Sequence, residues 1–481
     1  MTSGTEVVIG LDAGTTSAKA VAVNRAGEVV ADSVSDPIAT ASPSPGASEQ
    51  VPGEIWRALT SASRRMIERL ARESRVVAIA LAAQSGSVIG VDDAGAAVGP
   101  AITWMDTRSR SLVESWPART REQIRRLSGW SPSPGLGLAT IAWLASIEAA
   151  VPHGVTRWAS VDDYLGFGLT HRWVTNPSNA AGMQLMDVST LAWSPELCSL
   201  AGIEPALLSS IGSSGGVHGE LSIAAAEAMG LPHRVPAVIG GHDQACAALG
   251  LGAVSPGSMV LSAGTAWVLS VITGTPAIDS LPTAFNLSPH VADGRWSASR
   301  NLGGLGAAVA WSLDDTALSI DRAEADLAAC EPRLDDAFFV PSIDDERRTG
   351  WGNFVGDPDE TAGAARIRAV FEACAFEVRR AVEQAAMLDG SARELTFVGG
   401  GTRSAHLAQT IADVLDAPIT VQPDASWPAI GAARLAAEAS GWNLADTSAR
   451  PGMLVAARPR VAALMTQRYA TYTDLTERAS P

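Results

Sequence analysis

"VVIGLDAGTTSAKAVAV", residues 7–23, is the stretch of this sequence that decides the fold. It places an apolar run on each side of a short polar turn that contains Gly14, Thr15 and Thr16. Apolar runs joined by a glycine turn predict a β-hairpin. Backbone N–H groups in such a turn, with threonine hydroxyls beside them, can cradle an anion. We therefore expect a phosphate-binding hairpin, although an ordinary β-turn would show the same letters.

A second stretch of the same kind, "SMVLSAGTAWVLSVITGTP", occupies residues 258–276. Its turn contains Gly264 and Thr265, and Gly264 follows Gly14 by 250 residues, about half of the chain. Repetition at this spacing favours a duplicated domain. The alternative is chance, because Ala-Gly-Thr arises readily in a sequence rich in alanine and glycine. Two such turns would hold a nucleotide between the halves of the protein.

The rest of the chain alternates strand-like and helical segments, which predicts an α/β fold. At 481 residues, of which 47% are hydrophobic, the chain is long enough for two domains with large cores. The net charge of −16 argues against nucleic acid as a partner. No segment of about 20 residues is apolar enough for a membrane span. Four scattered cysteines without CxxC favour a reducing cytoplasm over a disulfide framework or a cysteine zinc site.

A nucleotide site in this chain cannot be a P-loop, because GxxxxGK[ST] needs a lysine after glycine. Lys19 is the only lysine in the sequence, and it follows Ala18. It lies close in sequence to Asp12, which ends the first apolar run and could hold Mg²⁺ through its carboxylate. Another glycine turn, residues 399–401, would let the backbone pack against an adenine ring, although Ser404 breaks the GxGxxG fingerprint of dinucleotide-binding proteins.

The segment "VPAVIGGHDQACAALGLGAV", residues 235–254, contains the candidate for acid–base chemistry. An apolar run ends at two glycines, and His242, Asp243 and Gln244 follow before an Ala-rich helical stretch. A carboxylate at a strand end suits removal of a proton from a sugar hydroxyl during phosphoryl transfer. We therefore predict Asp243 as the base and a structural role for His242. The GxSxG pattern at residues 212–216 lacks the strand and helix of a hydrolase elbow, which disfavours a serine hydrolase.

Seven segments of the chain occur in an order that is typical of one protein family. They are "IGLDAGTTSAKAVAVNRAGEVVA", "SEQVPGEIWRAL", "ITWMDTRS", "VIGGHDQACAALGLGAV", "LSAGTAWVLS", "RAVFEACAFEVRRAVE" and "FVGGGTRSAHLAQTIADVLDAPITV". With these segments the chain resembles the FGGY carbohydrate kinases, which belong to the superfamily of actin-like, hexokinase-like and Hsp70-like ATPases. No single segment is decisive, but seven in order along nearly the whole chain are specific.

The resemblance implies an α/β fold with two RNase-H-like domains of the actin-like ATPase type around a central catalytic cleft. Residues 1–253 would bind the sugar, and residues 254–481 would bind ATP. The resemblance implies ATP and Mg²⁺ as cofactors and a small-molecule sugar as the partner, with neither nucleic acid nor membrane, and a homodimer is a possible assembly. It places these residues near the nucleotide: Gly14, Thr15, Thr16, Lys19, Gly264, Thr265, Gly303, Gly304, Gly306, Gly400, Gly401 and Gln409. It places Asp12 and Asp243 at the metal, Asp243 also as the catalytic base, and these residues at the sugar: Gln84, Ser85, Gly86, Asp106, Arg108, Asp243 and Gln244.

The chain departs from the family's pattern at three positions. Many members carry Gln-x-His-Gly or Gln-Arg-Glu-Thr where this chain has Gln-Ser-Gly-Ser at residues 84–87, so one polar sugar contact is missing. Gly86 in place of a bulky residue predicts extra room in the sugar pocket, unless a neighbouring side chain fills the space. The usual Gly-Glu-Arg reads Asp-Glu-Arg at residues 345–347, and Trp427 with Pro428 replaces an acidic residue before the last Gly-Ala-Ala helix.

The expected reaction is ATP-dependent phosphorylation of a terminal primary hydroxyl of a neutral sugar. An open-chain ketopentose of the xylulose or ribulose type is the first choice, on family frequency alone. A ketohexose, or a polyol such as erythritol or glycerol, is the alternative. A non-catalytic ATP-binding sensor of the same fold is a remote alternative, which the intact Asp243 disfavours.

Overall fold

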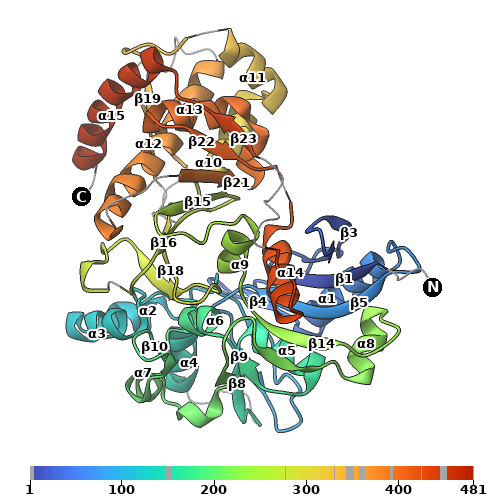
Figure 1. The fold of residues 1–481 in the computed structure, drawn as a ribbon. Coiled ribbons are helices and arrows are strands. Elements are labelled where there is room, and N and C mark those ends of the chain that lie inside the picture. Colours follow the sequence, from blue (N-terminus) through green and yellow to red (C-terminus); the bar gives the residue numbers. More distant parts are fainter. Residues whose placement is uncertain are drawn as a thin grey trace.

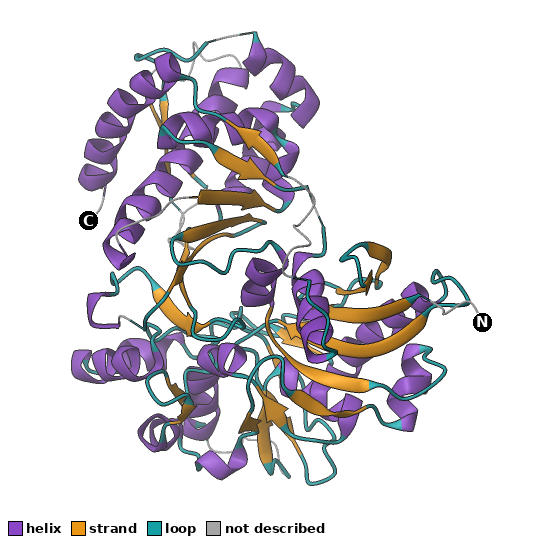
Figure 2. Ribbon diagram, in the orientation of Figure 1, coloured by secondary structure: helices purple, strands orange, loops and turns teal. Residues whose placement is uncertain are grey.

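Two sheets with helices packed against them make up most of the chain (Figures 1 and 2). The fold is seen in a computed structural model that describes residues 5–147, 154–276, 278–329, 331–342, 351–356, 363–389, 394–423, 425–444 and 452–479. This architecture confirms the predicted α/β class with two sheet-bearing halves. Among the described helices, none has both the length and the apolar character that crossing a bilayer requires.

The N-terminal sheet has six strands in the order β13-β14-β5-β1-β2-β3. Its central strands β14, β5 and β1 are parallel, and the outer pairs are antiparallel. Nearly every residue of β1 is buried, as expected for a central strand covered on both faces. The strands are β1 (Glu6–Ala13), β2 (Ala18–Asn24), β3 (Val29–Val34), β5 (Arg75–Ala83), β13 (Val217–Glu220) and β14 (Pro236–His242).

The C-terminal sheet repeats this topology and adds one strand, in the order β17-β18-β16-β15-β21-β22-β23. The hairpin β15–β16 corresponds to β1–β2, and β15 pairs in parallel with β21 as β1 does with β5. The repeated topology agrees with the expected duplication. The strands are β15 (Ser258–Ala263), β16 (Trp267–Thr273), β17 (Asn286–Pro289), β18 (Trp296–Asn301), β21 (Glu394–Val398), β22 (Ile419–Val421) and β23 (Met453–Val455).

Helix α14 (Trp427–Ala439) comes from the C-terminal half of the sequence but packs on the N-terminal sheet. Figure 1 shows it beside β1 and α9 (Asp243–Gly250). Three glycines allow the backbones to touch, because a Cβ at Gly10, Gly250 or Gly431 would overlap main-chain atoms across these contacts. Helix α14 therefore ties together the two elements that carry Asp12 and Asp243. The opposite face of the sheet is covered by α1 (Pro52–Ile67), α5 (Val161–Thr170) and α8 (Ile223–Met229).

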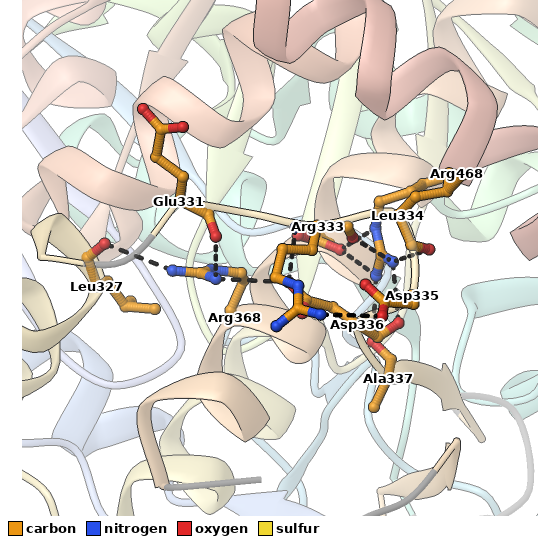
Figure 3. A network of polar contacts seen from close by, with 10 residues as sticks. Leu327, Glu331, Arg333, Leu334, Asp335, Asp336, Ala337, Arg368 and Arg468 are labelled. Atoms are coloured by element: carbon orange, nitrogen blue, oxygen red, sulfur yellow. Dashed lines mark hydrogen bonds and ion pairs between the residues drawn. The ribbon is translucent and has the colours of Figure 1, made fainter.

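The C-terminal sheet packs mainly against the long helix α12 (Gly363–Asp389), with α10 (Leu305–Thr316), α13 (Ala405–Leu415) and α15 (Pro459–Ala479) around it. A buried arginine anchors α15. Arg468 is 0% exposed and ion-pairs with Glu372 of α12 at 2.6 Å. It also donates to four backbone carbonyls between residues 333 and 337, which Figure 3 shows. A buried charge needs this many partners, since an unpaired one is very costly.

A second connection between the halves lies at the start of β17. Arg125 donates to the carbonyls of four residues between 281 and 285, and Leu287 N donates to Gly129 O at 2.9 Å.

The remaining N-terminal elements are β4 (Glu49–Gln50), β6 (Ile89–Val91), β7 (Ala101–Ile102), α2 (Arg110–Ser115), α3 (Ala118–Ser128), α4 (Gly137–Ser146), β8 (Arg157–Ala159), β9 (Val174–Thr175), α6 (Pro177–Gly182), β10 (Met186–Asp187), β11 (Ala192–Trp193), α7 (Pro195–Ala201) and β12 (Ser210–Ile211). The remaining C-terminal elements are α11 (Ile320–Ala328), β19 (Phe338–Pro341) and β20 (Gly352–Val355).

Candidate active site

The carboxyl ends of three neighbouring parallel strands, β1, β5 and β14, form the edge of the N-terminal sheet that carries the candidate site. The strand register places Asp12 opposite Ala82, and Ala82 opposite Gly241. Asp12 and Asp243 therefore emerge at the same edge, since Asp243 follows Gly241 by two residues. In open α/β sheets ligands bind beyond this edge.

Asp243 is the first residue of α9, directly after the end of β14. Its side chain is 22% exposed, and its Oδ1 lies 3.0 Å from Nε2 of His242. The arrangement leaves the carboxyl group of Asp243 within reach of a ligand, while His242 holds one of its oxygens.

Asp12 occupies the end of β1 and is almost fully buried, with 3% of the residue exposed. Burial raises the pKa of Asp12 to about 7, although Lys19, whose Nζ lies 3.7 Å from Oδ2, pulls it down and the charge of Asp243 adds to the rise. Among the described residues, Oδ1 of Asp12 has no hydrogen-bond partner. A buried oxygen without a donor, next to a second carboxylate, is a place that a hard divalent cation would stabilise.

The first glycine turn contacts Gln84, which was predicted for the sugar side, and two further residues. Thr15 Oγ1 donates to Gln84 Oε1 at 2.9 Å and accepts from Trp104 Nε1 at 3.1 Å, and Gln50 Nε2 donates to Thr15 O at 2.7 Å. Thr16 is exposed beside it. Trp104 and Gln50 were not predicted as site residues, although both lie in segments that carry the family resemblance. The signal in the sequence that could have identified Trp104 is its place two residues before Asp106, which was predicted.

The second glycine turn lies between the start of α10 and the turn at residues 399–401. A Cβ at Gly306 would overlap the carbonyl of Gly264, and one at Gly401 would lie 2.8 Å from the Cβ of Ala263. A helix N-terminus and close backbone groups suit a phosphate. The structure therefore brings together these predicted residues: Gly264, Thr265, Gly303, Gly304, Gly306, Gly400 and Gly401.

Gln409 is not brought to these turns. Its Nε2 donates to Asp413 Oδ1 at 3.0 Å and to Ala456 O at 2.9 Å, which directs the amide toward the segment after β23. Asp413 also binds Arg458 at 2.6 Å. The predicted contact of Gln409 with the nucleotide is not supported by this geometry, because the amide is part of a packing network between α13 and the chain that leads into α15.

The expected room beside Gly86 is absent. Its backbone has φ of +88°, a conformation that favours glycine, and a Cβ there would approach Leu136 Cδ2 at 2.7 Å and Trp104 Cβ at 3.4 Å. Leu136 and Trp104 therefore occupy the space beside Gly86, which supports the alternative that neighbouring side chains fill it rather than a roomier pocket. The neighbouring Ser85 Oγ donates to Asn179 O at 3.0 Å.

Asp106 and Arg108 are engaged with protein groups. Arg108 ion-pairs with Asp106 at 2.7 Å and with Glu49 at 2.8 Å, and Asp106 Oδ2 also accepts from Ser48 N at 2.9 Å. The cationic charge of Arg108 is thus balanced by two carboxylates. Gln244 is partly buried on the first turn of α9. The Asp-Glu-Arg at residues 345–347 lies outside the described residues.

Comparison with known proteins identifies the family. Residues 7–250 match the N-terminal domain and residues 259–440 the C-terminal domain of the FGGY family of carbohydrate kinases. The chain is 26% identical to the xylulose kinase of Staphylococcus xylosus over 446 residues, which cover 90% of this chain and 91% of the relative. It is also 26% identical to the gluconokinase of Bacillus subtilis over 461 residues, 91% of this chain and 88% of the relative.

Among solved structures, the xylulose kinase from Rhodospirillum rubrum is similar over 98% of both chains, with a TM-score of 0.90 and 26% sequence identity. The likeness therefore extends over both sheets and the helices that connect them. From its two matching domains, the chain belongs to the FGGY family of carbohydrate kinases and is a sugar phosphotransferase with ATP as its co-substrate.

Proposed function

We propose that this kinase transfers the γ-phosphoryl group of ATP to a terminal primary hydroxyl of an open-chain ketopentose of the xylulose or ribulose type. The observation that carries the proposal is the meeting of Asp12 and Asp243 at one sheet edge. In this assignment residues 1–253 hold the sugar and residues 254–481 hold the nucleotide, with α14 crossing between them.

Asp243 is the proposed base. It would accept the proton of the attacking hydroxyl, which must lie within hydrogen-bond reach of the carboxylate. Gln84 and Gln244 supply amide groups beside it, and Gln84 Nε2 is buried without a partner among the described residues, which leaves a donor for a sugar oxygen. The two glycine turns would bind the phosphates, whose charge the reaction redistributes.

Mg²⁺ would be held by Asp12, with Asp243 beside it. The unpartnered buried Oδ1 of Asp12 fits such an ion, and no group of three or more metal-ligating side chains occurs among the described residues. This agrees with the preference of Mg²⁺ for one or two carboxylates together with phosphates and water. The ion would neutralise charge on the phosphates during transfer.

A neutral substrate is favoured over an acid sugar such as gluconate. Arg108 is the one cation among the predicted sugar residues, and two carboxylates already balance its charge. A substrate carboxylate near this group would have to displace one of them or be buried without a partner, which is costly. The filled space beside Gly86 also removes the reason to expect a larger sugar.

A coupled assay of ADP release over ketopentoses, ketohexoses, polyols and gluconate tests the substrate. We expect a ketopentose to give the highest kcat/KM and gluconate a value lower by more than about 100-fold, since unpaired polar groups in a site discriminate strongly. A gluconate value equal to or above that of every ketopentose would refute the neutral-sugar assignment. If none of the ketopentoses supported ADP release, the ketopentose assignment would be refuted.

Asp12→Asn is expected to raise the Mg²⁺ concentration needed for half-maximal activity by at least about tenfold, since even residues behind a metal ligand contribute 10–100-fold to metal affinity. Asparagine keeps the shape but removes the charge. A Mg²⁺ titration of kcat measures the effect, and Asp36→Asn, at an exposed carboxylate paired with Arg65, is the control. Titrations that coincide for Asp12→Asn and the wild type would remove Asp12 from the metal site.

A further inference from the structure

The hydroxyl of Ser178, on α6, contacts the backbone immediately before the proposed base. Ser178 Oγ accepts a hydrogen bond from His242 N at 2.9 Å, and Ser178 is 1% exposed. A Cβ at Gly241 would lie 3.0 Å from the same oxygen and would overlap Val291 Cγ1, so glycine keeps this corner closely packed. The bond therefore fixes the peptide at which β14 ends and α9 begins with Asp243.

A second hydrogen bond gives this hydroxyl a single orientation. Ser178 Oγ donates to Asn176 Oδ1 at 2.6 Å, which leaves its lone pairs for His242 N. Asn176 is itself held, because its Oδ1 also accepts from Asn179 N at 3.0 Å and its Nδ2 donates to Asp162 Oδ2 at 3.2 Å. Asn176 Nδ2 donates also to Asn179 Oδ1 at 2.9 Å, so the orientation of its amide is fixed by partners on both sides.

Asp162 is the anchor of this chain of hydrogen bonds. It is 7% exposed, and it accepts from Thr175 Oγ1 at 2.7 Å and from Ser160 Oγ. Ser160 also caps α5 together with Asp163, so the anchor belongs to a helix that packs in the N-terminal core. A buried and fully connected network of this kind is rigid.

Helix α6 holds the neighbouring strand end as well. Asn179 is 0% exposed, and its Nδ2 donates to the carbonyls of Ala83 at 3.3 Å and Gln84 at 3.4 Å. In return Ser85 Oγ donates to Asn179 O at 3.0 Å. Two adjacent residues of one short helix thus hold the ends of β5 and β14, which carry Gln84 on one side and Asp243 on the other.

We propose that Ser178 is a positioning residue that aligns the carboxylate of Asp243 with the substrate hydroxyl. Asn179 holds the backbone at Gln84, at the end of the neighbouring strand. The inference rests on the proposed role of Asp243. Proton transfer needs the base within hydrogen-bond reach of its donor, and a displacement of about 1 Å can cost on the order of 100-fold in rate. In this role Ser178 acts through Asp243 and does not have to touch the substrate.

The test compares kcat and KM of Ser178→Ala with those of the wild type on the preferred sugar. We expect kcat to fall by about 10–100-fold, with KM for sugar and ATP changed by less than about twofold, because geometry of the base changes and ground-state binding does not. Ser178→Thr keeps the hydroxyl and should recover most of kcat. Ser178→Cys keeps the volume but weakens the hydrogen bond, so its kcat should lie between those of the alanine variant and the wild type. It replaces the alanine variant in the test if that variant does not fold.

Ser63→Ala is the matched control. Ser63 is equally buried and donates to Met229 O at 3.2 Å between α1 and α8, far in sequence from the strand ends. Both alanine variants should lower the midpoint of thermal unfolding, but only Ser178→Ala should lower kcat. A Ser178→Ala enzyme with wild-type kcat, or with a raised KM as its only change, would overturn the inference.

Asp243→Asn separates this inference from the function on which it rests. If Asp243→Asn is inactive and Ser178→Ala is fully active, the base stands and the positioning role falls. If Asp243→Asn keeps its turnover, the base assignment and the positioning role both fall.

Discussion

Asp243→Asn should reduce kcat by about 10²–10⁴-fold, the usual effect of removing a general base. Asparagine has the same shape, so its Oδ1 can still accept from His242 Nε2, which lies 3.0 Å from Asp243 Oδ1 in the native protein. The side chain is partly exposed and starts a helix, so the loss of charge should leave the fold intact. The KM values for sugar and ATP should change less than kcat, because the carboxylate acts mainly when the proton moves.

The measurement is kcat and KM from ADP release, with circular dichroism to confirm folding. Asp321→Asn is the control, because Asp321 is also a carboxylate in the first turn of a helix, α11, but it is exposed and far in sequence from the strand ends. Its kcat should equal that of the wild type. An Asp243→Asn enzyme that retains more than a tenth of wild-type turnover would exclude Asp243 as the base.

The parts of the site that depend on local sequence could be predicted. A β-hairpin fixes which residues face each other, so the approach of Lys19 to Asp12 follows from the turn at Gly14, and the two are cross-strand partners in β1 and β2. The placement of Asp243 at a strand end followed from an apolar run, two glycines and a helical stretch. Each of these signals spans only a few residues along the chain.

The parts that depend on distant contacts could not be predicted. Whether Gly86 leaves space depends on Leu136, which lies 50 residues further along the chain. Gln409 has a helical position that suits several partners, and only the fold shows that Asp413 and Ala456 take its amide. Hydrophobic periodicity marks the buried face of a helix but does not name the neighbour that covers it.

The packing of helix α14 is another contact that the sequence could not predict, and it matters more for the position of the two carboxylates. Its Ala-rich sequence predicts a helix, but nothing in it indicates that a helix from the C-terminal half completes the N-terminal core. The contact is made by backbone, since a Cβ at Gly431 would overlap the carbonyl of Cys246 on α9, and one at Gly10 on β1 would overlap the carbonyl of Ala429. The spacing of Asp12 and Asp243 therefore depends on a helix that begins more than 180 residues after Asp243 in the sequence.

Gly431→Ala should consequently destabilise the protein by about 3 kcal/mol or more, at the upper end of what overpacking costs, because neither backbone can move aside without separating α9 from α14. Activity of the folded fraction should fall too, since α9 begins with Asp243. Thermal unfolding and kcat are the measurements. Gly53→Ala in α1 is the control, because nothing lies within 4 Å of a Cβ there, and alanine in a helix should leave stability unchanged or raise it by up to about 1 kcal/mol. If the two variants unfolded at the same temperature, close packing of α14 on α9 would not be what holds the two carboxylates at one edge.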